Sequence, residues 1–185
     1  PTTGVTDLNG HTLTIDVTGT TGNQTGRLTG ASGSSLVKTG SGTWNMMPYV
    51  DITNLPNSND GNWNDFANNT QIRVEEGELL IDGGTQNRNR ASRNTAEFIV
   101  STGATLTFSS ANTVGDLSTV EIAAGAIFNS EVGDLINNVT GEGTFNLTGG
   151  TLSLRNTTAG ATFSGTLTGG GNLAMYGRYS NQQPW

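Results

Sequence analysis

Three neighbouring glutamates, Glu75, Glu76 and Glu78, are the residues of this chain best suited to chemistry. Two carboxyl groups on one surface can serve as the general acid and the general base of a hydrolysis, and such pairs cleave polysaccharides. Glu76 and Glu78, however, flank Gly77 at a position where the local pattern needs only a turn before a strand. We therefore interpret the cluster as a solvated strand entrance and predict no catalytic residue and no enzyme activity.

A single histidine, His11, limits the remaining catalytic and metal chemistry. Any Ser-His-Asp triad would have to use this residue, which lies in an Asn-Gly-His turn. One imidazole in a chain without cysteine also cannot complete a zinc site. We predict no cofactor and no bound metal.

The segment 57–69 (NSNDGNWNDFANN) offers oxygen ligands, which hard cations such as calcium prefer. Asp60 and Asp65 would supply the carboxylates, but the order of ligands in an EF-hand loop fails at Pro56 and Ser58. We interpret the segment as an Asn-rich loop, with a calcium site as the open alternative.

Aromatic residues gather around the same segment, which a rigid scaffold could present to a partner. The predicted contacts with a surface carbohydrate or a protein are Trp44, Tyr49, Trp63 and Phe66. The alternative is that these rings cover one side of the chain as a small satellite core.

The composition excludes several classes of partner. The net charge is −7 with only eight basic residues, so no extended cationic surface for nucleic acid can form. Absence of cysteine excludes disulfides and a redox role. No apolar run approaches the roughly 20 residues that span a bilayer, so we predict no membrane insertion.

Short segments of alternating polarity, separated by Gly, Asn and Asp, predict β-strands and almost no helix. One phrase is repeated: residues 39–46 (TGSGTWNM) match residues 140–147 (TGEGTFNL). Another recurs at Gly77, Gly103 and Gly125, roughly 20 to 26 residues apart, which is the length of one solenoid coil.

The repeats predict a single all-β domain over 1–185: a β-solenoid of roughly eight coils about 40 Å long. A loop insert covers about 47–69 and an irregular tail about 177–185. An antiparallel sandwich or barrel is the alternative fold.

Period two fixes the expected direction of the side chains. Polar neighbours such as Thr107, Asn146 and Ser153 should face outward, and threonine spacing is too irregular in sequence for a flat ice-binding array. The side chains expected to face inward are Leu79, Ile81, Leu106, Phe108, Ile122, Phe145, Leu147, Leu152 and Leu154.

The segment 35–44 (SLVKTGSGTW) resembles the L-x-K-x-G-x-G-T signature of the autotransporter-associated β-strand repeat, found in passenger regions of bacterial surface proteins. Residues 70–81 (TQIRVEEGELLI) are similar to the family's following phrase, and residues 99–106 (IVSTGATL) to the next one. The resemblance implies a right-handed parallel β-helix exported by a bacterium.

We therefore expect an extracellular or cell-surface structural and adhesive protein, either a stalk segment of an adhesin or a subunit of an end-to-end filament. A carbohydrate-binding module that uses the aromatic insert is the alternative, and a polysaccharide-active enzyme is a further one. Open β edges template further strands, so we expect self-association or continuation by further coils of the same polypeptide. The residues predicted for this contact are Thr12, Leu13, Ile15, Val17, Leu173, Met175 and Tyr176.

Overall fold

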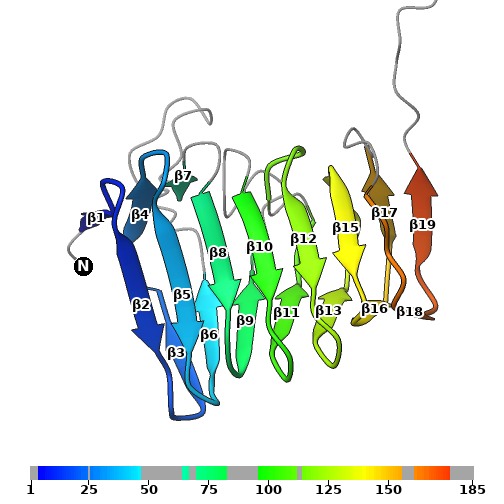
Figure 1. Ribbon diagram of the computed structural model, residues 1–185, viewed down its shortest axis with the longest axis horizontal. Coiled ribbons are helices and arrows are strands. Elements are labelled where there is room, and N and C mark those ends of the chain that lie inside the picture. The colour runs from blue at the N-terminus through cyan, green and yellow to red at the C-terminus, as the bar shows by residue number, and fades with distance from the viewer. Residues whose placement is uncertain are drawn as a thin grey trace, which may run out of the picture.

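The computed structural model describes residues 4–24, 26–46, 64–66, 70–82, 96–111, 114–155 and 161–175. In these ranges the chain forms nineteen strands and no helix. Every strand pairing is parallel, which confirms the all-β solenoid and excludes the antiparallel sandwich or barrel. The chain winds as a right-handed parallel β-helix (Figure 1).

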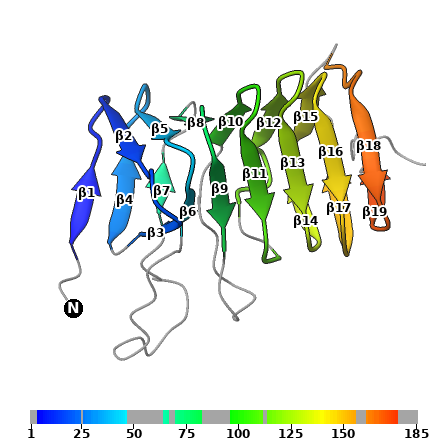
Figure 2. The same ribbon diagram turned by 90° about the horizontal axis from the view of Figure 1, so that it is seen from below.

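Two long parallel sheets form two sides of the rod. The six-stranded wall contains, from the N-terminal end, β2 (Thr12–Asp16), β5 (Ser35–Thr39), β8 (Thr70–Val74), β10 (Ala96–Val100), β12 (Thr119–Ile122) and β15 (Asn138–Gly141). The seven-stranded wall contains β3 (Thr21–Asn23), β6 (Thr43–Met46), β9 (Glu78–Ile81), β11 (Thr105–Phe108), β13 (Ile127–Ser130), β16 (Thr144–Leu147) and β18 (Thr166–Gly169). Figure 2 shows the strands of the seven-stranded wall side by side.

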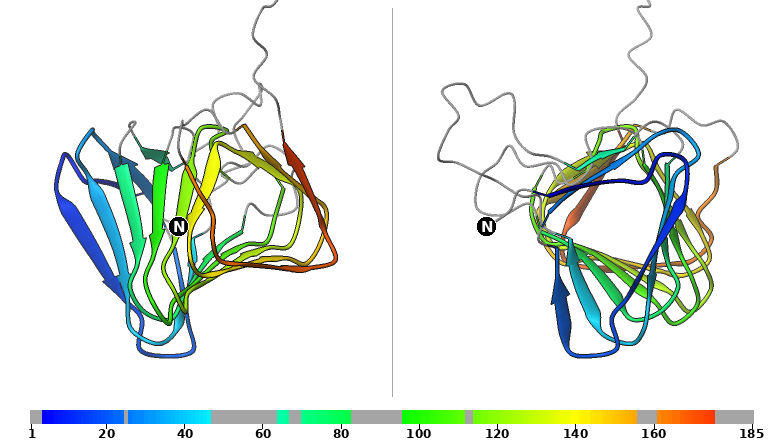
Figure 3. Two further views of the ribbon diagram at one scale, coloured as in Figure 1. Left: turned by 45° about the vertical axis from the view of Figure 1, so that its right-hand side comes forward. Right: turned by 90° about the vertical axis from the view of Figure 1, so that its left-hand side faces the viewer.

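Two short sheets form the third side, one near each end of the rod. Near the N-terminal end lie β1 (Val5–Asp7), β4 (Arg27–Gly30) and β7 (Asp65–Phe66), and near the C-terminal end lie β14 (Asp134–Ile136), β17 (Thr151–Leu154) and β19 (Asn172–Met175). The view along the axis in the right panel of Figure 3 shows the resulting three-sided outline. The coils near both ends of the rod therefore cross three faces.

The longest wall has seven strands, one fewer than the eight coils that the sequence predicts. The difference arises because successive strands of this wall are unequally spaced in sequence. Thr107 and Asn129 are neighbours at a separation of 22 residues, whereas Thr43 and Glu78 are neighbours at a separation of 35. Inserted residues lengthen the chain without adding a coil.

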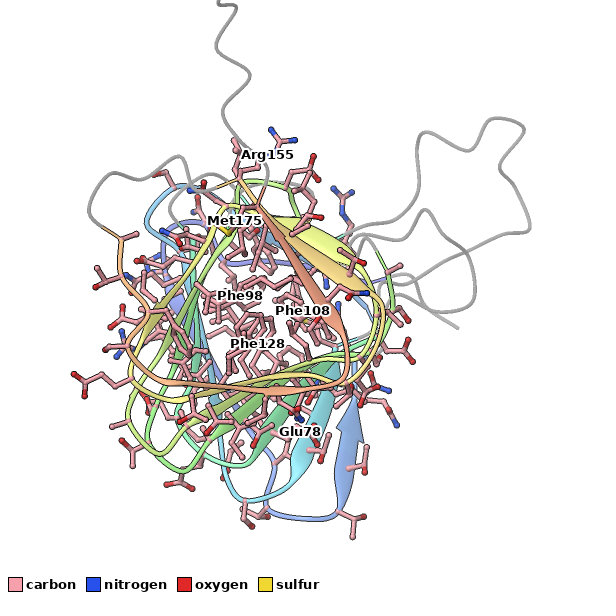
Figure 4. All side chains as sticks on the ribbon, turned by 90° about the vertical axis from the view of Figure 1, so that its right-hand side faces the viewer. Glu78, Phe98, Phe108, Phe128, Arg155 and Met175 are labelled. Atoms are coloured by element: carbon pink, nitrogen blue, oxygen red, sulfur yellow. The ribbon has the colours of Figure 1, made fainter. Side chains whose placement is uncertain are left out.

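The interior confirms the predicted register. All nine residues expected to face inward have exposed fractions of 7% or less. A file of phenylalanines runs along the axis, with ring centroids 5.6 Å apart for Phe98 and Phe108, 4.9 Å for Phe108 and Phe128, and 5.0 Å for Phe128 and Phe145. Figure 4 shows three of these rings inside the coils. Each such pair contributes about 0.5–1.5 kcal/mol beyond the area it buries.

Thr107 faces outward as predicted, but its side chain is not solvent-exposed. Asn146 and Ser153 are half-buried on the outer surface, but Thr107 is only 2% exposed. Its hydroxyl donates to Glu78 Oε1 at 2.6 Å and accepts from Asn129 Nδ2 at 3.2 Å. Longer side chains from the two adjacent strands therefore cover this residue on the outer face.

The repeated phrase Thr-Gly-x-Gly-Thr forms the corner between the two long walls. Its first glycine has a positive φ in both copies, +76° at Gly40 and +104° at Gly141. A Cβ at Gly40 would overlap the carbonyl oxygen of Val17, and one at Gly141 would overlap that of Ile122. Both the backbone conformation and the close approach of the preceding coil therefore require glycine.

Leu106→Asp should destabilise the fold by about 4 kcal/mol or more, because it places an unpaired charge among buried apolar side chains. Thr144→Asp is the matched control. Thr144 is half-buried on the outer face, where its neighbours in register are Ile127 and Thr166. Urea unfolding measures both. A Leu106→Asp midpoint close to that of the wild type would show that the register is wrong.

Candidate functional site

The three glutamates of the acidic cluster have separate surroundings. Glu75 and Glu76 are exposed in the turn after β8, and Glu75 lies 3.7 Å from Arg73 in a partly exposed ion pair. Glu78 is half-buried at the start of β9, where its carboxylate accepts the hydroxyl of Thr43 at 3.0 Å. Thr107 donates to the second oxygen of the same carboxylate. Glu78 is thus a hydrogen-bonding centre on the outer face of the seven-stranded wall.

That outer face carries two aligned rows of side chains, which the strand registers define. The threonine row contains Thr21, Thr43, Glu78, Thr105, Ile127, Thr144 and Thr166. The asparagine row contains Asn23, Asn45, Leu80, Thr107, Asn129, Asn146 and Thr168. Sequence reasoning missed both rows. The signal that could have found them is the recurring triplet Thr-x-Asn or Thr-x-Thr, present in five of the seven strands.

From Thr168 to Thr107 the asparagine row forms a continuous chain of side-chain hydrogen bonds. Thr168 donates to Asn146 Oδ1 at 3.2 Å, and Asn146 Nδ2 donates to Asn129 Oδ1 at 3.1 Å. Asn129 Nδ2 then donates to the Thr107 hydroxyl, which in turn donates to Glu78. All four donors point toward the N-terminal end, so the chain ends on a carboxylate that can only accept. Such side-chain bonds stabilise coil stacking in addition to the backbone ladder.

The row is interrupted on the other side of Glu78. Asn45 pairs in register with Leu80, whose side chain has no hydrogen-bonding group. The Oδ1 atom of Asn45 is buried without a partner. The hydrogen bonds of the asparagine row therefore continue only where each successive coil supplies a polar side chain at that position.

The threonines of the seven-stranded wall form a single interrupted row, which is not the flat ice-binding array that the sequence spacing argued against. Thr21, Thr43, Thr105, Thr144 and Thr166 do share one row despite their irregular sequence spacing. Glu78 and Ile127 interrupt it, and the Thr43 hydroxyl is donated to the Glu78 carboxylate. The row is aligned but not uniform.

Lys38, the lysine of the signature phrase, points into the rod. It occupies an inward row between Ile15 and Val74 and is 1% exposed. Its ammonium donates to the carbonyl oxygens of Thr39 at 2.8 Å, Gly40 at 2.6 Å and Glu76 at 2.9 Å. The first two belong to its own corner and the third to the next coil. Lys38 therefore joins two successive coils through their backbones.

Burial lowers the pKa of Lys38, because desolvation disfavours the charged form. The nearby carboxylates of Asp16 and Glu76 oppose this shift. Sequence reasoning placed Lys38 in the signature but assigned it no role, because a periodic pattern does not reveal which carbonyls the folded corner brings within reach of the ammonium.

Two of the four aromatic residues predicted to contact a partner are core residues. Trp44 is 4% exposed and Phe66 is fully buried, so neither presents a ring face to a sugar, which corrects the prediction for both. Their inward register positions place both in the main core, not in the small satellite core that the alternative expected. Tyr49 and Trp63 lie outside the described residues.

The described residues contain no cluster of three or more His, Asp or Glu side chains that could hold a metal ion. Of the two acidic residues considered for calcium, Asp60 lies outside these ranges, and Asp65 lies in β7 without a described side chain. A helix long and apolar enough to cross a membrane is likewise not found in this part of the chain.

Six of the seven residues predicted for self-association are described, and they lie at the two ends of the rod (Figure 1). Thr12 is exposed, and Leu13, Ile15 and Val17 are half-buried on or just after β2, the first strand of the six-stranded wall. At the other end Leu173 is 39% exposed and Met175 is 58% exposed on β19. Tyr176 lies outside the described residues.

Comparisons of this chain with protein-family models, with curated proteins and with solved structures found no match. The similarity to the autotransporter-associated repeat therefore rests on the signature residues themselves.

Lys38→Met should lower the free energy of unfolding by about 2–4 kcal/mol, because it removes three charge-assisted hydrogen bonds to backbone carbonyls of two coils. Arg73→Met, on the outer face of the adjacent strand, is the control and should change stability by less than about 1 kcal/mol. The lowered pKa gives a second readout. In the window below lysine's ordinary pKa the unfolded state binds more protons, so wild-type stability should rise with pH relative to Lys38→Met. Equal stability of the wild type and Lys38→Met at every pH would contradict the role of Lys38 as a buried donor that joins two coils.

Glu78→Ala should cost about 1–2 kcal/mol, because two hydroxyl donors lose their acceptor. Glu75→Ala removes only the partly exposed pair with Arg73 and should cost less than about 0.5 kcal/mol. The denaturant midpoints of unfolding separate the two variants. Equal midpoints would show that the hydrogen bonds to Glu78 do not stabilise the fold.

Proposed function

We propose that this protein is an extracellular structural and adhesive rod of a bacterium, either a stalk segment of a surface adhesin or a subunit of a filament. The observation that carries the proposal is the uninterrupted stacking of coils over the described residues, with one core along the axis. Six intervals of about 4.8 Å make the seven-stranded wall about 29 Å long. Such a rod serves as a spacer or a display scaffold.

The role of the signature residues supports the proposed membership of the autotransporter-associated repeats. Lys38 bonds the carbonyls of two successive coils, and Gly40 lies at a corner where the preceding coil allows no side chain. The signature is thus a coil-forming unit, which a family of repeated passenger coils requires. Export to the cell surface follows from that resemblance.

The alternative functions receive less support from the geometry. A carbohydrate-binding insert would have to rely on Tyr49 and Trp63, because Trp44 and Phe66 are buried. A polysaccharide-cleaving pair that included Glu78 would rely on a carboxylate whose two oxygens already accept hydroxyl groups of the wall itself. The structural role therefore accounts for more of the residues that the sequence singles out.

Antibodies raised against the purified chain should label intact cells of the native organism as strongly as permeabilised cells, because the proposal places the rod outside the envelope. An antibody against a cytosolic protein provides the control for leakage. Labelling confined to permeabilised cells would overturn the location. Sustained release of reducing ends from pectin-like or alginate-like polysaccharides, abolished by Glu78→Gln, would overturn the structural role.

A further inference from the structure

The turn between β1 and β2 contains the only Asn-Gly pair of the sequence, Asn9-Gly10. The backbone N–H of His11 donates to the carbonyl oxygen of Leu8 at 2.7 Å across this turn. Its two central residues have positive φ, +43° at Asn9 and +81° at Gly10. These are the features of a type I′ turn, which favours Asn-Gly at its centre. Both central residues are exposed to solvent.

An Asn-Gly pair carries the groups for its own modification. The Gly10 nitrogen, once its proton has left, attacks Cγ of Asn9 and expels ammonia, which closes a succinimide ring. Water then opens the ring at either of its two carbonyls and leaves aspartate or isoaspartate. Glycine permits the attack best, because no Cβ hinders the nitrogen.

Either product would disturb this turn. The N–H of Asn9 donates to Oδ1 of Asp7 at 3.0 Å, so a carboxylate created at Asn9 would add a second negative charge to the turn. Isoaspartate also inserts a methylene group into the backbone, which changes the length of a tight turn. Modification of Asn9 would therefore weaken the connection between the third side and the six-stranded wall.

The next coil holds the attacking nitrogen. The turn that precedes β5 lies beside the turn between β1 and β2 (Figure 1), and there the Gly10 N–H donates to Oγ of Ser34 at 3.0 Å. Ser34 is only 1% exposed, so the N–H points at a buried side chain. Its hydroxyl accepts the hydrogen bond but is not a base at neutral pH, and the proton stays on the nitrogen. Since ring closure needs the reacting atoms aligned, this hydrogen bond opposes it.

We propose that Asn9 is the site at which this chain deamidates when it is unfolded, and that the hydroxyl of Ser34 suppresses the reaction in the folded rod. The substrate is the chain itself, water is the co-reactant, and ammonia is the leaving group. One coil thus protects the neighbouring coil chemically in addition to stabilising it. The inference concerns a modification site and does not depend on the proposed location or role of the rod.

Peptide mapping of the full chain by mass spectrometry tests the site. Deamidation raises the mass of the peptide that contains Asn9, and chromatography separates its aspartate and isoaspartate forms. The chain is incubated in mildly alkaline buffer with and without urea. The folded wild type should deamidate at Asn9 about tenfold or more slowly than the unfolded chain, because only the folded turn withholds the nitrogen. Equal rates would overturn the protection, and deamidation of the unfolded chain elsewhere but not at Asn9 would overturn the site.

Ser34→Ala tests the protecting group, because it removes the acceptor of the Gly10 N–H. It should raise the rate of deamidation at Asn9 in the folded chain severalfold. Ser118→Ala is the matched control, since the fully buried Ser118 hydroxyl accepts the N–H of Ala96 at 3.3 Å in another coil. This control should leave the rate at Asn9 unchanged. Circular dichroism verifies that each variant keeps the strand content of the wild type.

Hydrogen exchange gives a second measurement that needs no variant. In the folded wild type the Gly10 amide should exchange well below its rate in the unfolded chain, because its hydrogen bond must open first. An unprotected Gly10 amide would overturn the role of Ser34, as would a Ser34→Ala rate equal to that of the wild type. An equal rise in Ser34→Ala and Ser118→Ala would assign the effect to general loosening of the rod and would also overturn it.

Discussion

The fold depends on parallel stacking in register, in which each strand pairs with the equivalent strand one coil away. At a spacing of about 4.8 Å, a side chain in one coil lies directly on its counterpart in the next. Each row must therefore contain residues that tolerate each other at contact distance. The inward row from Trp44 through Leu79, Leu106 and Phe128 meets this condition with apolar groups alone. Any polar residue in an inward row must find partners within the coils.

Lys38 is the instructive exception to apolar inward rows. Removing an ammonium from water costs several kcal/mol. Three hydrogen bonds from a charged donor, each worth about 1.5–3 kcal/mol, do offset it. They also join the carbonyls of two successive coils through one side chain. An aliphatic side chain at this position would make none of these hydrogen bonds to the backbone.

The strands and the direction of their apolar residues could be predicted from the sequence, because period two and the repeated phrase are local properties. The composition of the outer rows could not, since it depends on which strands become neighbours. The separations of 22 and 35 residues between adjacent strands conceal the threonine row from any fixed sequence period. Burial of Thr107 has the same origin, because Glu78 and Asn129 reach it only after stacking. The burial of Trp44 and Phe66 likewise follows from register and not from their place beside a polar insert.

The asparagine row shows how stacking gives the rod a direction. Hydroxyl and amide groups both donate and accept, so a row of them can pass hydrogen bonds along the axis with one orientation. From Thr168 to Thr107 every donor points to the N-terminal side, whereas Thr43 donates from the opposite side. Two opposed donors can meet only at a group that accepts twice and donates nothing, which the carboxylate of Glu78 provides. An acidic residue in an otherwise uncharged face thus has a structural cause, and its position follows from the point at which the two directions meet.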